Sequence, residues 1–311
     1  MECDGRPLLR SLHSQSLGAC VEWPAAGCKE YCARRGEIIC WLVTAFDEMQ
    51  LRDEWLVASV CLLDRIAVAW QRDQLANGEG VPLVEMLAVV CLALKFSSAE
   101  PEMHPLELKG IILKLAQAKQ PRDLLYLESM WKKIIQAEWH SFRLVRYRVA
   151  VPTVLDLANC LAMDVDAQAL RESTVWPGAD LVQVTSRNGG REQRRLFAIL
   201  SAFLAELAVA NLHLGLPNSD APPLVLAIVA VRLALQAFSK PPPEAAWQSL
   251  RLAEKLLAVE ELKLLQTHTA WLQRLCISKP ADAVVLKWQK RGCGWRGFSL
   301  CPYRRPTCRQ S

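Results

Sequence analysis

The chain has 311 residues, of which 52% are hydrophobic and 22% charged, and its 37 basic and 32 acidic residues give a net charge of +5. This apolar content excludes a disordered or low-complexity chain, and the length is enough for two domains. The mild charge excludes the strongly basic surface that is typical of a dedicated nucleic-acid-binding protein.

Two observations on apolar segments indicate an intracellular protein without a membrane partner. The N-terminus has no unbroken apolar stretch of the kind found in secretory signals. The most apolar run, residues 224–238, is too short to span a bilayer and contains Arg232.

Apolar residues recur at helical spacing along the first half of the chain, and no segment alternates as a strand would. We predict helices over residues 37–49, 54–70, 82–96, 107–119 and 123–141, with a loop at 77–80. Pro152 breaks the pattern and marks a domain boundary. The sequence therefore predicts an all-α protein.

A repeated pattern relates the two halves of the chain. Residues 82–84 (PLV) recur as 223–225, a shift of 223 − 82 = 141, and the same shift aligns apolar positions of 63–69 and 90–94 with 204–210 and 231–235. Chance similarity between Leu/Ala-rich helices is the alternative to a duplication. The duplication predicts two tandem five-helix lobes, residues 30–148 and 152–278, each built around its third helix. An N-terminal extension, 1–29, and a basic tail containing Cys and Trp, 279–311, would flank them.

The twelve cysteines do not have the spacing of a metal site. Four of them, Cys61, Cys91, Cys160 and Cys276, lie singly in apolar helical patterns, and no pair shows the Cys-x2-Cys spacing of zinc ligands. We therefore expect reduced structural thiols and neither metal nor cofactor.

Four segments follow one another in the order and spacing of a known domain. They are 35–42 (RGEIICWL), 51–65 with its Leu-Asp-Arg ending, 92–96 (LALKF) followed by Pro101-Glu102, and 138–153, which ends in YRVAVPT. Together they resemble the cyclin box, so the chain is similar to the cyclins, and residues 283–288 resemble the segment that closes the second cyclin lobe. The resemblance implies a regulatory subunit without catalytic activity. Its partner would be a cyclin-dependent serine/threonine kinase in cell-cycle control, in the nucleus, the cytoplasm or both.

The resemblance also implies roles for individual residues. Lys95 and Glu138 stand at the positions that contact the kinase, although a helix-end lysine and a solvated glutamate are the simpler interpretations. Arg35 and Asp64 stand at the positions of an internal ion pair that ties the first helix to the second.

A substrate-docking groove is a further possibility that the resemblance raises. Its positions are Arg34, Ile38, Trp41 and Thr44. Arg34 stands where methionine is usual and Thr44 where an acidic residue is frequent, so this groove would repel the arginine of a docking peptide.

Two other functions stay open at this point. One is a two-lobe transcription factor that binds DNA and polymerase, for which the basic tail, including Lys287, Trp288 and Lys290, is the main evidence, although a solvated end is the commoner explanation of such a tail. The other is a helical scaffold that has lost kinase activation. An enzyme acting on a small-molecule substrate is not expected, because the five histidines are scattered and no phosphate-binding loop is present.

Overall fold

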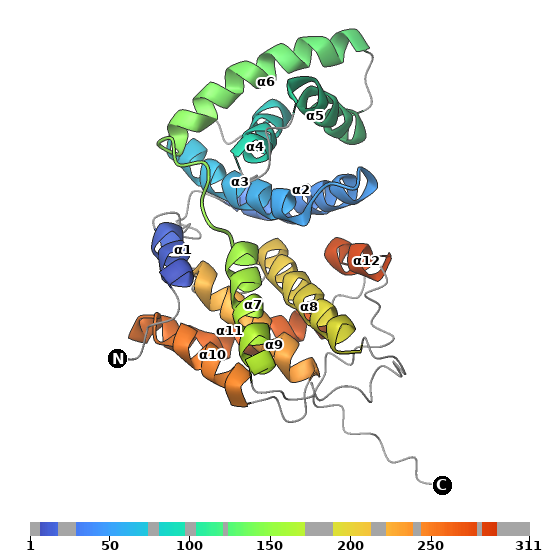
Figure 1. Ribbon diagram of the computed structural model, residues 1–311. Helices are drawn as coiled ribbons and strands as arrows, with labels where there is room; N and C mark the ends of the chain where they lie inside the picture. The colour runs from blue at the N-terminus through green and yellow to red at the C-terminus, as the bar shows by residue number, and fades with distance from the viewer. Residues whose placement is uncertain are drawn as a thin grey trace. The chain divides into compact units, whose positions relative to one another are not determined.

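The computed structural model describes residues 7–17, 29–73, 81–96, 104–120, 124–171, 189–212, 222–238, 244–278 and 282–290. Over these residues the chain is all-helical, with twelve helices and no strand (Figure 1). The predicted fold class, all-α, is therefore confirmed. By its internal contacts the chain divides into two compact units, which we describe separately. The first unit is Ser14–Thr153 with Val209–Asp220, and the second is Met1–His13, Val154–Ala208 and Ala221–Ser311.

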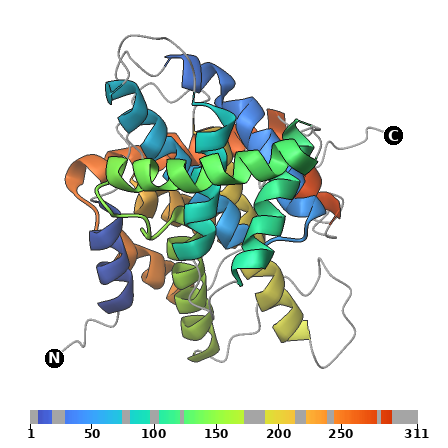
Figure 2. The ribbon, with the colours of Figure 1, turned by 90° about the horizontal axis from the view of Figure 1, so that it is seen from above.

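The first unit is built around one helix that is apolar on all sides. It contains α2 (Lys29–Glu48), α3 (Asp53–Asp73), α4 (Leu83–Phe96), α5 (Pro105–Lys119) and α6 (Leu124–Leu144). Every residue of α4 from Met86 to Leu94 is buried, and α3, α5 and α6 pack against this helix. In Figure 2 the green α6 crosses the blue-green α4. Small residues of α4, such as Ala88 and Ala93, let these neighbours approach closely.

The second unit also has a buried central helix. Its helices are α7 (Val154–Arg171), α9 (Pro223–Phe238), α10 (Glu244–Glu254), α11 (Val259–Ser278) and α12 (Ala283–Lys290). It also contains α8 (Gly189–Asn211) as far as Ala208, the last residues of that helix belonging to the first unit, and α1 (Pro7–Leu17) begins in it. Residues 224–231 and 233–235 of α9 are buried, and α7, α10 and α11 pack against it. The prediction that the helices beginning near Pro82 and Pro223 are buried is thus confirmed.

Two helices differ from the sequence prediction because their buried faces carry polar residues. The N-terminal extension contains α1, whose buried positions are Leu9, His13 and Ser16. The predicted tail begins with α12, in which Lys287 is only 2% exposed and Trp288 is also buried. Assigning Lys287 and Trp288 to a solvated tail is therefore wrong.

The contacts of α12 explain why a lysine is buried there. The Lys287 ammonium forms an ion pair with Glu206 of α8, and the indole Nε1–H of Trp288 donates to the other oxygen of Glu206 at 2.9 Å. The ring of Trp288 also meets Phe203 edge to face, with centroids 6.1 Å apart. The carboxylate thus neutralises the lysine and satisfies the indole, which makes their burial affordable. Residues 291–311 of the predicted tail lie outside the described residues.

None of the helices in the described part of the chain combines the length and apolarity needed to cross a bilayer. The six cysteines described there are free thiols, with Cys91 and Cys276 buried and Cys40 exposed.

Candidate protein-docking surface

Lys95 and Glu138 come together at the surface of the first unit. Lys95 lies in the last turn of α4, where the helix dipole favours a cation, and Glu138 lies in α6. The Lys95 ammonium donates to both carboxylate oxygens, at 2.9 and 2.6 Å. The side chain of Lys95 is 36% exposed and that of Glu138 is 11% exposed. The largely buried Glu138 therefore holds the pair in place, and the more exposed Lys95 is accessible to a partner.

A buried thiol supports this ion pair. Cys91, one turn before Lys95 in α4, is fully buried. Burial raises the pKa of the Cys91 thiol strongly, and its hydrogen bond to Glu138 and the charge of that carboxylate raise it further. The thiol therefore stays protonated and adds no further negative charge beside the Glu138 carboxylate.

Four aromatic side chains lie next to the ion pair and form what we call the aromatic patch: Phe96, Trp139, Phe142 and Tyr147. Phe142 is its centre, with ring centroids 5.9 Å from Phe96, 6.2 Å from Trp139 and 5.0 Å from Tyr147. Phe96 is 47% exposed, Trp139 61% and Tyr147 57%. Phe96 and Trp139 follow Lys95 and Glu138 directly in sequence, so the patch adjoins the ion pair.

The backbone after α6 fixes the position of Tyr147. Arg146 and Tyr147 both adopt left-handed conformations, with φ values of 51° and 62°. The Tyr147 N–H donates to the carbonyl of Phe142 at 2.9 Å, and the Arg146 N–H donates to that of Arg143 at 2.9 Å. Non-glycine residues adopt this conformation rarely, and here it turns the tyrosine ring back onto Phe142.

Exposed aromatic side chains beside a pair of charges are typical of a protein-binding surface. A monomeric protein seldom leaves such rings in contiguous contact with water, and aromatic residues are enriched at interfaces. The ion pair adds specificity, because a partner that covers it has to satisfy the hydrogen-bonding groups that Lys95 and Glu138 leave unused. We call the aromatic patch together with Lys95 and Glu138 the docking surface.

Arg35 and Asp64 form an ion pair inside the first unit, away from solvent. Arg35 is fully buried, and its Nε and Nη2 donate to the two oxygens of Asp64 at 2.8 and 2.7 Å. The hydroxyl of Tyr31 donates to Asp64 at 2.7 Å. Arg35 also donates to the backbone carbonyls of Val209 and Ala210, both at 2.9 Å. Sequence reasoning did not anticipate Tyr31 or the two carbonyls.

The titration of this network follows from its burial. Burial raises the pKa of Tyr31 well above its usual range, and the charge of Asp64 raises it further. For Arg35, burial opposes the charged form, but the charge and hydrogen bonds of Asp64 outweigh it and raise the pKa. The arginine therefore stays charged and the tyrosine stays protonated, as the observed bonds require.

The residues of the possible docking groove do not all lie together. A shallow groove of about 600 Å³ beside α2 is lined by Trp41 and Thr44, together with Glu37, Cys40 and Glu48. Arg34 is exposed but does not line it. Ile38 is buried, because the apolar stripe of α2 faces the core. Placing Ile38 in the groove is therefore wrong.

The groove carries the opposite charge from the one expected. Glu37 and Glu48 supply carboxylates that sequence reasoning overlooked, since it considered only Arg34 and Thr44. Lys119 from α5 places its ammonium 5.4 Å from the ring centroid of Trp41.

Among the described residues, no cluster of three or more His, Cys, Asp or Glu side chains could hold a metal ion. When the chain is compared with protein-family models and with curated proteins, none of them matches it.

Proposed function

We propose that this chain is the regulatory subunit of a cyclin-dependent serine/threonine kinase and acts in cell-cycle control, in the nucleus or the cytoplasm. The observation that carries the proposal is the docking surface. Lys95 and Glu138, the two positions that the sequence resemblance links to a kinase, lie in mutual contact beside four clustered aromatic rings, three of them exposed.

The chemistry of the surface suits an amphipathic helix. Its apolar side chains would cover Phe96, Trp139 and Tyr147, and its polar groups would bond to Lys95 and Glu138. In a kinase of this class the helix that carries the catalytic glutamate must move inward before its Lys–Glu ion pair forms. A rigid surface that binds only the inward position shifts the kinase toward its active state.

The buried α4 gives the surface the rigidity that this role needs. Lys95 and Phe96 extend from a helix whose preceding nine residues are packed on all sides. Their positions are therefore set before a partner arrives, which lowers the ordering cost of binding.

The test begins with affinity capture of the full chain from cells, followed by mass spectrometry and a phosphorylation assay on the captured material. We expect a cyclin-dependent kinase that is active in the complex. Recovery of no kinase, with salt-sensitive retention on DNA instead, would favour the transcription-factor function. Recovery of an inactive kinase would favour the scaffold function.

Variants of the surface test the assignment of its residues. The pair Lys95→Ala/Glu138→Ala and the single change Trp139→Ala should each weaken kinase binding roughly 30-fold or more, as for interface hot spots. The matched control is Lys109→Ala/Glu128→Ala, which removes an exposed ion pair of 2.8 Å between α5 and α6. Equal binding by the control and the docking-surface variants would refute the site.

A further inference from the structure

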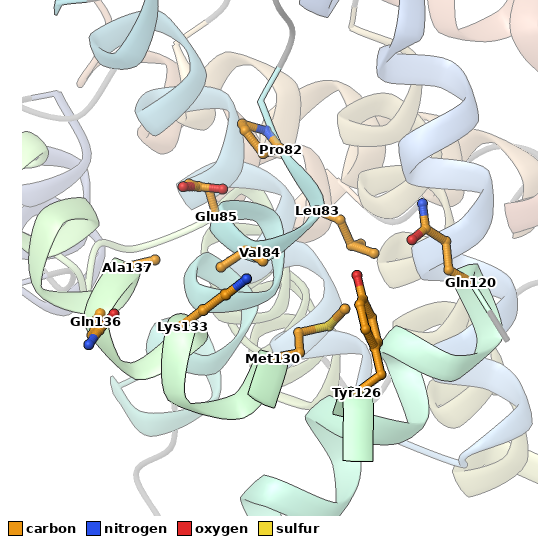
Figure 3. A pocket seen from close by; sticks show the side chains of 10 residues that line it. All are labelled: Pro82, Leu83, Val84, Glu85, Gln120, Tyr126, Met130, Lys133, Gln136 and Ala137. Atoms are coloured by element: carbon orange, nitrogen blue, oxygen red, sulfur yellow. The ribbon is translucent and has the colours of Figure 1, made fainter. Parts of the chain in front are cut away.

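A second concave site lies in the first unit, at the start of α4 and apart from the docking surface. It is an open pocket of about 400 Å³ bounded by the first turn of α4, the end of α5 and the middle of α6 (Figure 3). Leu83 and Met130 contribute apolar surface, and Glu85, Gln120, Tyr126 and Lys133 contribute polar groups. A few polar groups around an apolar lining are typical of ligand sites.

Glu85 is the acidic residue of this pocket. Its Oε2 atom is buried and has no hydrogen-bond partner among the described residues. Glu85 lies in the first turn of α4, where the helix dipole favours the ionised carboxylate. Glu85 lines the pocket and is partly exposed, so a ligand that brings a charged N–H group to its carboxylate forms a charge-assisted hydrogen bond.

Lys133 does not neutralise the carboxylate of Glu85. It extends from α6 at the same pocket, its side chain is exposed, and it forms no ion pair with Glu85 in the described structure. Figure 3 shows Glu85 and Lys133 toward one side of the pocket and Gln120 and Tyr126 on the other. The pocket therefore offers a carboxylate from α4 and a more exposed ammonium group from α6.

The shape favours one side chain of a larger ligand. Five of the ten lining residues, Pro82, Gln120, Tyr126, Lys133 and Gln136, are exposed, so most of a bound molecule would stay in solvent. An arginine side chain fits this arrangement, because its apolar stem can cover Leu83 and Met130 while its guanidinium donates to Glu85. A carboxylate close to that arginine would then meet Lys133.

We propose that this pocket binds an arginine side chain of a partner peptide, with a neighbouring acidic residue of the same peptide paired to Lys133. The proposal goes beyond the proposed function and does not depend on it, since the pocket shares no residue with the docking surface. Variants of the two sites can therefore fail independently.

The probe is the blocked peptide acetyl-Gly-Arg-Ala-Glu-Gly-amide, titrated into the full chain and followed by backbone amide chemical shifts. We expect the largest shifts at residues 83–85 and 130–137. Replacing the peptide arginine by citrulline keeps its shape and removes its charge, and should weaken binding roughly tenfold. Glu85→Gln should weaken binding similarly, and should make arginine and citrulline nearly equal. Lys133→Met should weaken binding of this peptide, and it should leave unchanged the binding of the same peptide with alanine in place of its glutamate.

Matched controls keep each outcome decisive. Glu128→Gln removes a carboxylate from α6 outside the pocket and should leave the affinity unchanged. Lys133 is exposed, so Lys133→Met tests the pocket even if Glu85→Gln lowers stability. Shifts that cluster elsewhere, or a Glu85→Gln variant that still prefers arginine over citrulline, would overturn the proposal. Free arginine that binds as tightly as the peptide would overturn the peptide as occupant.

Discussion

Replacing Arg35 with alanine should strongly destabilise the first unit. The change leaves the carboxylate of Asp64 buried without its counter-charge, although the Tyr31 hydroxyl still donates to it. It also removes the N–H groups that bond to the carbonyls of Val209 and Ala210. Breaking a buried ion pair in this way costs about 3–5 kcal/mol. For a domain of roughly 150 residues each kcal/mol shifts Tm by about 2–4 °C, so we expect a decrease of roughly 6–20 °C.

The assay is thermal unfolding followed by circular dichroism, with amide hydrogen exchange to show where protection is lost. Exchange should increase in α2, α3 and α4 and change less in α9 and α11. Asp64→Asn should also be destabilising, because it leaves the guanidinium of Arg35 without its counter-charge. The double variant Arg35→Met/Asp64→Leu removes both charges and should cost less than either single change. A Tm within about 2 °C of the original for Arg35→Ala would refute the reasoning.

Three further predictions concern other buried groups. Lys287→Ala should destabilise the second unit by about 3–5 kcal/mol in urea unfolding, because it leaves the Glu206 carboxylate buried without its counter-charge. The control Lys290→Ala changes an exposed residue and should cost about 1 kcal/mol or less, so equal effects of the two variants would contradict the buried pair. Burial lowers the pKa of His268 below 6.5, so the unfolded chain binds a proton at this residue before the folded chain does as the pH falls. The contribution of His268 to the free energy of unfolding should therefore be constant above about pH 6.5 and decrease below it. His268→Phe should reduce the slope of the free energy of unfolding against pH. Iodoacetamide at pH 8 should alkylate the exposed Cys40 well before the buried Cys91, because burial raises the pKa of the Cys91 thiol. Mass spectrometry of the peptides measures the two rates, and alkylation of Cys91 before Cys40 would contradict the prediction.

The helices of the first unit could be predicted from sequence because their apolar positions recur regularly. The segments 54–70, 82–96, 107–119 and 123–141 correspond closely to α3, α4, α5 and α6. The first prediction began too late, at Glu37, whereas α2 starts at Lys29. The missing turns contain Tyr31 and Arg35, whose polar atoms are buried only because Asp64 receives them. A hydrophobic pattern cannot show such a pairing.

The same cause explains what was missed at the sites and in the terminal helices. On its buried face α1 carries His13 and Ser16, and α12 buries Lys287 against Glu206, so polar residues interrupt the apolar face of each helix. Of the docking surface, only Lys95 and Glu138 were predicted from the sequence, because the exposure of a side chain cannot be read from sequence. Phe142 and Tyr147 looked like ordinary helix and linker residues, and only the left-handed turn brings their rings together.

The bonds from Arg35 to Val209 and Ala210 have a consequence for the order in which the chain matures. The donor and its acceptors are 174 and 175 residues apart, and the first unit includes Val209–Asp220 as well as Ser14–Thr153. While the chain is being synthesised, α2 to α6 emerge from the ribosome long before these carbonyls do. Until then two N–H groups of a buried guanidinium need water or another acceptor. We therefore expect a nascent chain that ends at Thr153 to remain protease-sensitive around α2 and to become resistant only after Ala210 has emerged.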